Sequence, residues 1–254
     1  MEWSDDGIVL AARKHGEAAA IVTLLTRAHG RHAGLVRGGA GRRARGLYQP
    51  GNRVRATWRG RLAEHLGAYT CEMADAVAAG MLADPLRLAA LSAACAVAET
   101  ALPEREAHLP VFEGLEILLS SLTDDDDETA WPTVYVKWEM GLLQELGFGL
   151  DLSRCAATGA SDGLTHVSPK SGRAVSAAAA KPYRGKLLEL PGFLLMAGTL
   201  GRPDEIVTGL RLTGYFLDRH VFSQRRDPKQ PDARARLADR LRAHADAQAG
   251  VAQP

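Results

Sequence analysis

The chain has 254 residues, of which 46% are hydrophobic and 24% are charged. These ordinary values exclude a disordered or fibrous chain, and the length accommodates one large or two modest domains. No apolar run approaches the roughly 20 residues that a bilayer requires, the longest being residues 193–200, and Asp5 and Asp6 stand where a signal peptide would be apolar. Three distant cysteines offer neither a disulfide framework nor a CxxC metal clamp. We therefore expect a cytoplasmic protein.

The net charge of +1 conceals an uneven distribution of charge. The first 70 residues carry twelve basic and five acidic residues, and the remaining 184 carry 19 basic and 25 acidic residues. A concentrated positive field attracts polyanions such as nucleic acids and is unfavourable without a partner. We therefore predict a polyanion-binding module in the first 70 residues, with a merely solvated basic surface as the alternative.

The first 75 residues are predicted to form short strands separated by glycine-rich turns. The expected strands are residues 7–11, 20–26, 32–37, 52–59 and 65–71, with TRAHGR (26–31) as a hairpin turn between the second and the third. In the fourth strand apolar residues alternate with polar ones, which predicts one buried face and one solvent face. The apolar set is Val54, Ala56 and Trp58, and the solvent set is Arg53, Arg55, Thr57 and Arg59. Five short strands in this length are typical of an OB-fold barrel, which commonly binds oligonucleotides.

After Ala76 the apolar period changes to about 3.6 residues, which predicts an all-α domain over residues 77–254. Asp84 followed by Pro85 is a typical helix start. Further helices are expected at residues 110–122, from 132 to Gly147, and at 204–222, with a peripheral helix at 231–248. Residues 148–186 are rich in glycine, serine and alanine, which predicts an irregular insertion. The expected fold class is therefore α+β, with an OB-fold barrel over residues 1–76 followed by the helical domain.

Three motifs match catalytic or metal sites only in part. The acidic run at residues 124–128 lacks the glycine and glutamate that an EF-hand calcium loop requires at its sixth and twelfth positions. GASDG (159–163) matches GxSxG with Ser161, but its flanks predict neither the preceding strand nor the following helix of a nucleophile elbow. SPKSG places Lys170 and Ser171 as a phosphate loop would, without the preceding glycines. We predict no catalytic residue, no metal site and no enzyme, and a serine hydrolase using Ser161 is kept as an alternative.

The candidate nucleic-acid contacts lie in the basic segment. GGAGRR (38–43) combines flexible backbone N–H donors with arginine side chains, which suits a phosphate backbone without base specificity. Tyr48 is the candidate for stacking on a base, whereas Trp58 shares the inward parity of its strand. The histidines of this segment, His15, His29, His32 and His65, are expected at turns or on the surface. The predicted DNA-binding residues are Arg13, Lys14, Arg31, Arg37, Arg42, Arg43, Arg45, Tyr48, Arg53, Arg55 and Arg59.

Four segments occur in an order that resembles one known family. They are GIVLAARKHGEAAAIVTLLTRAHGRHAGLVRGGAGRRARGLYQPG (7–51), VKWEMGLLQELGFGLDLSRC (136–155), HVSPKSGRAVS (166–176) and LTGYFLDRHV (212–221). The first combines RxxGE (13–17), TRxHGR (26–31) and the basic glycine-rich loop. This order resembles the RecO family of bacterial DNA repair and recombination mediator proteins, over about residues 7–222.

The resemblance implies an N-terminal OB-fold, a helical C-terminal domain and no enzymatic turnover. It also implies a protein that binds single- and double-stranded DNA and anneals complementary strands. Its implied partners are RecR, with which it loads RecA, and the acidic tail of the single-stranded DNA-binding protein. Because lysine and arginine displace counterions from each strand, binding should weaken steeply with salt. An RNA-binding OB-fold protein would share the basic barrel but not this role, and remains an alternative.

One departure from the family bears on cofactors. Many relatives carry four cysteines as a zinc site in the irregular region. Here only Cys155 remains, with Thr158, Ser176 and Ala179 where partners would be expected. A lone thiolate cannot hold structural zinc. We therefore predict no metal and no cofactor, and expect packing or hydrogen bonds to hold the surrounding loop.

Overall fold

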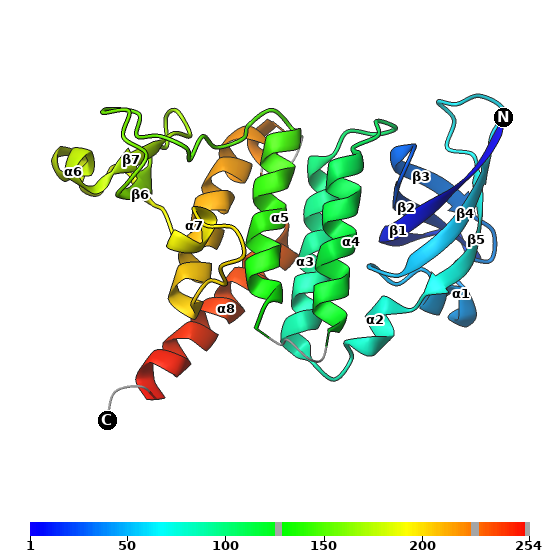
Figure 1. The fold of residues 1–254 in the computed structure, drawn as a ribbon. Coiled ribbons are helices and arrows are strands. Elements are labelled where there is room, and N and C mark those ends of the chain that lie inside the picture. The colour runs from blue at the N-terminus through cyan, green and yellow to red at the C-terminus, as the bar shows by residue number, and fades with distance from the viewer. Residues whose placement is uncertain (125–128, 225–228, 252–254) are drawn as a thin grey trace. The chain divides into compact units, whose positions relative to one another are not determined.

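A computed structural model describes residues 1–124, 129–224 and 229–251 (Figure 1). These residues form two compact units. The first comprises residues 1–124 together with 231–234, and the second comprises the described residues between 125 and 230 and those from 235 onward. The acidic run considered for calcium lies, apart from Asp124, outside the described residues.

The first unit begins with five strands that close into a barrel, drawn in blue to cyan in Figure 1. They are β1 (Glu2–His15), β2 (Ala19–Thr26), β3 (Gly30–Val36), β4 (Arg53–Arg59) and β5 (Ala68–Asp75). Their order around the ring is β1-β2-β3-β5-β4, and every neighbouring pair is antiparallel except β3 and β5. The ring closes where Leu35 pairs with Ala68 and the Leu35 N–H donates to the Gly67 carbonyl at 3.1 Å. The predicted α+β class with an N-terminal five-stranded barrel is confirmed.

Alternation of apolar and polar residues builds the barrel core. Val54, Ala56 and Trp58 of β4 are buried as predicted, whereas Arg55 and Arg59 are exposed. The indole N–H of Trp58 donates to the Leu66 carbonyl at 3.0 Å, so the one polar group of this ring is satisfied inside the barrel. The fourth strand therefore presents its apolar face inward, as its period of two requires.

β1 is much longer than the predicted strand at residues 7–11. Its first half pairs with β4, from Glu2 opposite Arg59 onward, and its second half pairs with β2 as far as His15 opposite Ala19. Both ends are polar, so the apolar pattern marked only the middle of the strand. The predicted TRAHGR turn is confirmed between β2 and β3, where Gly30 has a positive φ of 64°.

Four helices complete the first unit: α1 (Arg42–Leu47), α2 (Val77–Gly80), α3 (Pro85–Ala101) and α4 (Leu109–Thr123). Asp84 caps α3 as predicted, because its carboxylate accepts the backbone N–H groups of Leu86 and Arg87 at 2.8 and 3.0 Å. α3 and α4 confirm the helices expected in this region. α1 was expected to be a loop.

The second unit contains α5 (Trp131–Glu145), α7 (Pro203–His220) and most of α8 (Asp232–Val251). α5 and α7 approach closely at Gly209, where a Cβ atom would lie 2.9 Å from a Val136 methyl group. Buried within this pair, the hydroxyl of Thr213 donates to the Glu139 carboxylate. The three helices lie close to their predicted ranges, and Leu237 and Leu241 of α8 are buried.

The segment expected to be irregular, residues 148–186, contains two of the three strands of a small sheet instead of only loops. The strands of the sheet are β6 (Leu164–Val167), β7 (Ala174–Ser176) and β8 (Leu188–Glu189), in the order β7-β6-β8. The short helical elements of the second unit are α6 (Ala177–Ala180), η1 (Lys181–Tyr183), η2 (Gly192–Leu194) and η3 (Phe222–Gln224). Strands of two to four residues are too short to show a sequence period. Within the described ranges, no helix combines the length and apolarity needed to cross a bilayer.

Candidate nucleic-acid interface

α1 carries three of the predicted arginines, Arg42, Arg43 and Arg45, and all three are exposed. Its other side chains hold it on the barrel, because Ala44 and Leu47 pack against the barrel core. The helix itself buries no residue completely, so it leaves no apolar stripe in the sequence. A helix of this kind presents charge from an anchored backbone.

Asn52 fixes the end of α1. Its side-chain amide donates to the carbonyls of Gly46 and Leu47 at 2.9 and 3.2 Å, and its carbonyl oxygen accepts the Ala78 N–H at 3.0 Å. These bonds satisfy carbonyls that the end of a helix leaves without partners. No sequence motif predicted this role for Asn52. It shares the inward parity of Val54, so a polar residue on the buried face was the available signal.

Three N–H groups of the glycine-rich loop before α1, which the sequence predicted as free donors, are hydrogen-bonded within the protein. The N–H of Gly39 donates to Val36, that of Ala40 to Ala18 and that of Gly41 to Gly38, at 3.0 to 3.2 Å. A Cβ atom on Gly39 would lie 2.8 Å from the Ala20 methyl group. The glycines therefore allow the loop to pack on β2, and the charge of this region comes from side chains.

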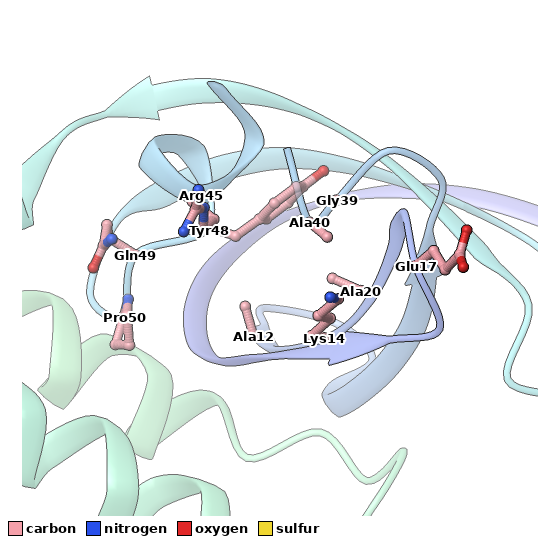
Figure 2. Close-up of a pocket in the computed structure, with 10 residues that line it drawn as sticks. All are labelled: Ala12, Lys14, Glu17, Ala20, Gly39, Ala40, Arg45, Tyr48, Gln49 and Pro50. Carbon is pink, nitrogen blue, oxygen red and sulfur yellow. The ribbon is translucent and has the colours of Figure 1, made fainter. Parts of the chain in front are cut away.

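A pocket of about 530 Å³ lies between α1 and the hairpin of β1 and β2 (Figure 2). Lys14 and Glu17 line it from the hairpin, and Arg45 and Gln49 line it from α1 and the residues that follow. Lys14 and Val36 are both paired with Ala20, which brings Arg37 to the same end of the barrel. We call Lys14, Arg37, Arg42, Arg43 and Arg45 the α1 cation cluster.

The α1 cation cluster is exposed, and none of its five side chains forms an ion pair with another described residue. The carboxylate of Glu17 lines the same pocket. A local excess of positive charge without internal partners attracts polyanions at long range. The cluster is the part of the predicted site that the structure leaves available.

Two predicted DNA-binding residues instead hold the barrel to the helices of the first unit. Arg31, whose side chain is only 14% exposed, donates to the Leu102 carbonyl at 2.8 Å and pairs with Glu104 at 3.4 Å. Arg53 pairs with Asp75 at 3.1 Å and donates to the Glu116 carbonyl at 3.2 Å on α4. Both assignments to DNA stay predictions, and the guanidinium groups of both residues already have partners within the protein.

Three further predicted residues are exposed but ion-paired. Each has a carboxylate oxygen 2.8 Å from a guanidinium nitrogen. The pairs are Arg13 with Glu99, Arg55 with Asp6, and Arg59 with Glu2. The carboxylates neutralise much of the field that a phosphate would meet, so these arginines are weaker candidates than the α1 cation cluster.

The predicted stacking residue Tyr48 belongs to the barrel core. It is only 5% exposed, so little of its ring is open to a base, and its stacking role stays a prediction that this burial disfavours. The pKa of its hydroxyl is raised. Burial is the largest cause, and the neighbouring Cys71 is the second. His32 was expected at a turn or on the surface and is also buried, at 3% exposed, with the Tyr69 hydroxyl 3.0 Å from its Nδ1.

The region of the missing zinc cysteines is held by hydrogen bonds. The Ser176 N–H donates to the Cys155 sulfur at 3.2 Å, and the Ser176 hydroxyl oxygen lies 3.4 Å from that sulfur. Hydrogen bonds from Ser176 and then Thr158 lower the pKa of the Cys155 thiol to about 6. One thiol with two hydroxyl-bearing neighbours does not fit structural zinc, which takes four cysteine or histidine ligands.

Ser161 lies exposed in a loop before β6. The element after it is a strand, and a nucleophile elbow requires a helix at that place. Lys170 and Ser171 lie in the turn between β6 and β7, where the Gly172 N–H donates to the Ser168 carbonyl at 2.9 Å. The structure gives neither motif the surroundings of its catalytic counterpart.

Comparison with known proteins covers nearly the whole chain. Residues 1–76 match the family described as recombination protein O N terminal, and residues 82–229 match recombination protein O C terminal. A DNA repair protein RecO of Rhodospirillum centenum is 54% identical over 244 residues, which cover 95% of each chain. Proteins of the same name are 50% identical in Rhodospirillum rubrum and 52% identical in Phenylobacterium zucineum, covering 95% of this chain and 97% and 98% of theirs. The chain belongs to the RecO family.

Proposed function

We propose that this protein is a DNA-binding recombination mediator in DNA repair, acting in the cytoplasm by binding and not by catalysis. The observation that carries the proposal is the α1 cation cluster, which joins five exposed cations at one end of a barrel of the OB-fold type. The names of its relatives, DNA repair protein RecO, point to the same polyanion.

The α1 cation cluster supports binding to phosphates without base specificity. Each side chain that neutralises a phosphate releases a condensed counterion, so affinity falls as salt rises. Neutralising two complementary strands on one protein also lowers the repulsion that slows their pairing. We infer that the protein binds single- and double-stranded DNA and anneals complementary strands.

The family also suggests protein partners. We propose that the chain works with RecR to load RecA on strands coated by single-stranded DNA-binding protein, and contacts the acidic tail of that protein. These partners are tested by measuring RecA filament formation on strands coated by single-stranded DNA-binding protein, with and without this chain and RecR. Unchanged filament formation when this chain is added would contradict the mediator role.

The decisive experiment compares two triple variants in the annealing of complementary oligonucleotides. Arg42→Gln, Arg43→Gln and Arg45→Gln together remove three cations of the α1 cation cluster. The matched control, Arg13→Gln, Arg55→Gln and Arg59→Gln, removes the same charge from exposed arginines that are ion-paired. We expect the first variant to anneal at least about tenfold more slowly than the wild type, and the control to be slowed much less.

If annealing is slowed equally in the two variants, the proposed function stands but the α1 cation cluster is not the main DNA-binding site. If the wild-type protein does not accelerate annealing, the function is wrong. Competition between RNA and single-stranded DNA of equal length then decides the alternative, because a strong RNA preference would favour an RNA-binding protein. Thermal unfolding of each variant shows that it is folded.

A further inference from the structure

Tyr183 has the most exposed aromatic side chain in the described part of the chain, with 55% of its surface exposed. It ends η1, and its side chain makes no hydrogen bond or ring contact with another described residue. The other exposed ring, that of Phe148, is stacked on His220 at a centroid distance of 4.9 Å. More than half of Tyr183 is therefore open to solvent, and no described aromatic ring stacks on it.

A tight turn follows Tyr183 and orders its neighbours. The Lys186 N–H donates to the Tyr183 carbonyl at 2.9 Å, Arg184 has φ −52° and ψ 133°, and Gly185 has φ 75°. These angles define a type II β-turn, in which glycine takes the position that requires a positive φ. Because the backbone is already fixed, binding through this turn orders only side chains.

Lys181, Arg184 and Lys186 lie within three residues of Tyr183 in the sequence. All three are exposed, and none forms an ion pair with another described residue. Over residues 164–189 the sequence has five lysines and arginines and one carboxylate, although the chain beyond residue 70 is acidic as a whole. We call Lys181, Tyr183, Arg184 and Lys186 the η1 turn.

The barrel itself lacks a free aromatic face among its described residues. Tyr48, Trp58 and Tyr69 are buried, and Trp3 is stacked on His29 and packs against Trp58, with centroid distances of 3.9 and 5.8 Å. Proteins that bind single strands combine cations that follow the phosphates with rings on which bases stack. The α1 cation cluster supplies charge alone, whereas the η1 turn joins charge to a free ring.

We propose that the η1 turn is a second contact for single-stranded DNA, in which a base stacks on Tyr183 and the flanking phosphates meet Lys181, Arg184 and Lys186. This proposal rests on the proposed function and deepens it. With one contact on each compact unit, a single molecule holds two strands, which is what annealing requires.

Photocrosslinking tests the contact directly in the full chain. An oligothymidine carrying 5-iododeoxyuridine is irradiated with the protein, and the joined peptides are sequenced by mass spectrometry. We expect Tyr183 among the crosslinked residues. Tyr183→Ala should weaken binding of the oligonucleotide about tenfold, and Tyr183→Phe, which keeps the ring, should leave it unchanged.

The charges are tested by the salt dependence of binding. Lys181→Gln, Arg184→Gln and Lys186→Gln together should make the slope of log affinity against log salt shallower by about 2, because each neutralised phosphate of a single strand contributes about 0.7 to it. The matched control, Arg154→Gln, Arg211→Gln and Arg236→Gln, removes equal charge from exposed arginines of the same unit. We expect it to leave the slope within experimental error.

The outcomes separate the two proposals. If the wild type binds the oligonucleotide, crosslinks form only in the barrel, and the η1 turn variants behave like their control, the second contact is wrong and the proposed function stands. If the wild type does not bind DNA, both are wrong. Crosslinking at Tyr183 with weaker binding by Tyr183→Ala and not by Tyr183→Phe supports the second contact.

Discussion

Gly30 and Gly16 have the same left-handed backbone conformation, each with φ 64°, but their surroundings differ. A Cβ atom on Gly30 would lie 1.8 Å from the Glu106 carbonyl oxygen, whereas one on Gly16 would meet nothing within 4 Å. We expect Gly16→Ala to cost about 1 kcal/mol and Gly30→Ala at least about 3 kcal/mol of unfolding free energy. Urea unfolding of both variants measures the difference. Equal losses of unfolding free energy in the two variants would show that the strained backbone conformation alone determines the cost.

His32 should make stability depend on pH. Burial, followed in size by the charge of Arg105, lowers the pKa of His32 to about 4 from 6.5. Between these values the unfolded chain binds a proton that the folded chain does not, so the unfolding free energy contributed by His32 falls as pH decreases from 6.5 towards 4, by about 1.4 kcal/mol per pH unit. Above pH 6.5 the contribution is constant.

Urea unfolding of the wild type and of His32→Gln at pH 7, 6 and 5 tests this dependence. The wild type should lose stability faster than the variant as the pH falls, because the glutamine does not titrate. Parallel profiles would show that another group is responsible for the acid sensitivity.

At the scale of elements, the sequence predicted the strands and helices whose buried residues recur with a regular period. β4 alternates and Asp84 caps α3, so the barrel and the long helices were found. α1 buries none of its residues completely, and β8 has only two residues. Neither element therefore produces a period of apolar residues in the sequence. The roles of Arg31 and Arg53 were also hidden, because only the folded chain places carbonyl and carboxylate partners beside them.

We predict that substitutions to cysteine near Cys155 create a zinc site. Tetrahedral thiolates at about 2.3 Å from zinc lie about 3.8 Å apart, close to the 3.4 Å between the Cys155 sulfur and the Ser176 hydroxyl oxygen. We expect Thr158→Cys, Ser176→Cys and Ala179→Cys together to bind one zinc ion and to raise the melting temperature in its presence. Metal content after dialysis measures this, with Ala178→Cys replacing Ala179→Cys as the control. Equal zinc content in the two variants would contradict a defined site.

At the scale of the whole molecule, exposed cations without ion pairs matter more than the net charge. The α1 cation cluster and the three cations of the η1 turn are on different compact units, although the chain is nearly neutral. If all eight meet phosphates, log affinity for single-stranded DNA should fall against log salt with a slope of about −5 to −6. Fluorescence anisotropy of a labelled oligothymidine at several salt concentrations gives this slope. A slope shallower than about −2 would show that most of these cations do not meet DNA.

Closing the ring of strands also limits how copies of the chain can polymerise. Sheets aggregate through unpaired edges, onto which another molecule adds a strand. Here β3 is joined to β5 at one end and bridged by Glu104 at Arg31 near its other end. β5 carries Glu72 and Asp75 along its length, so a second β5 added beside it would bring like charges together. The closed ring and these charges thereby protect the barrel from fibre formation by strand addition.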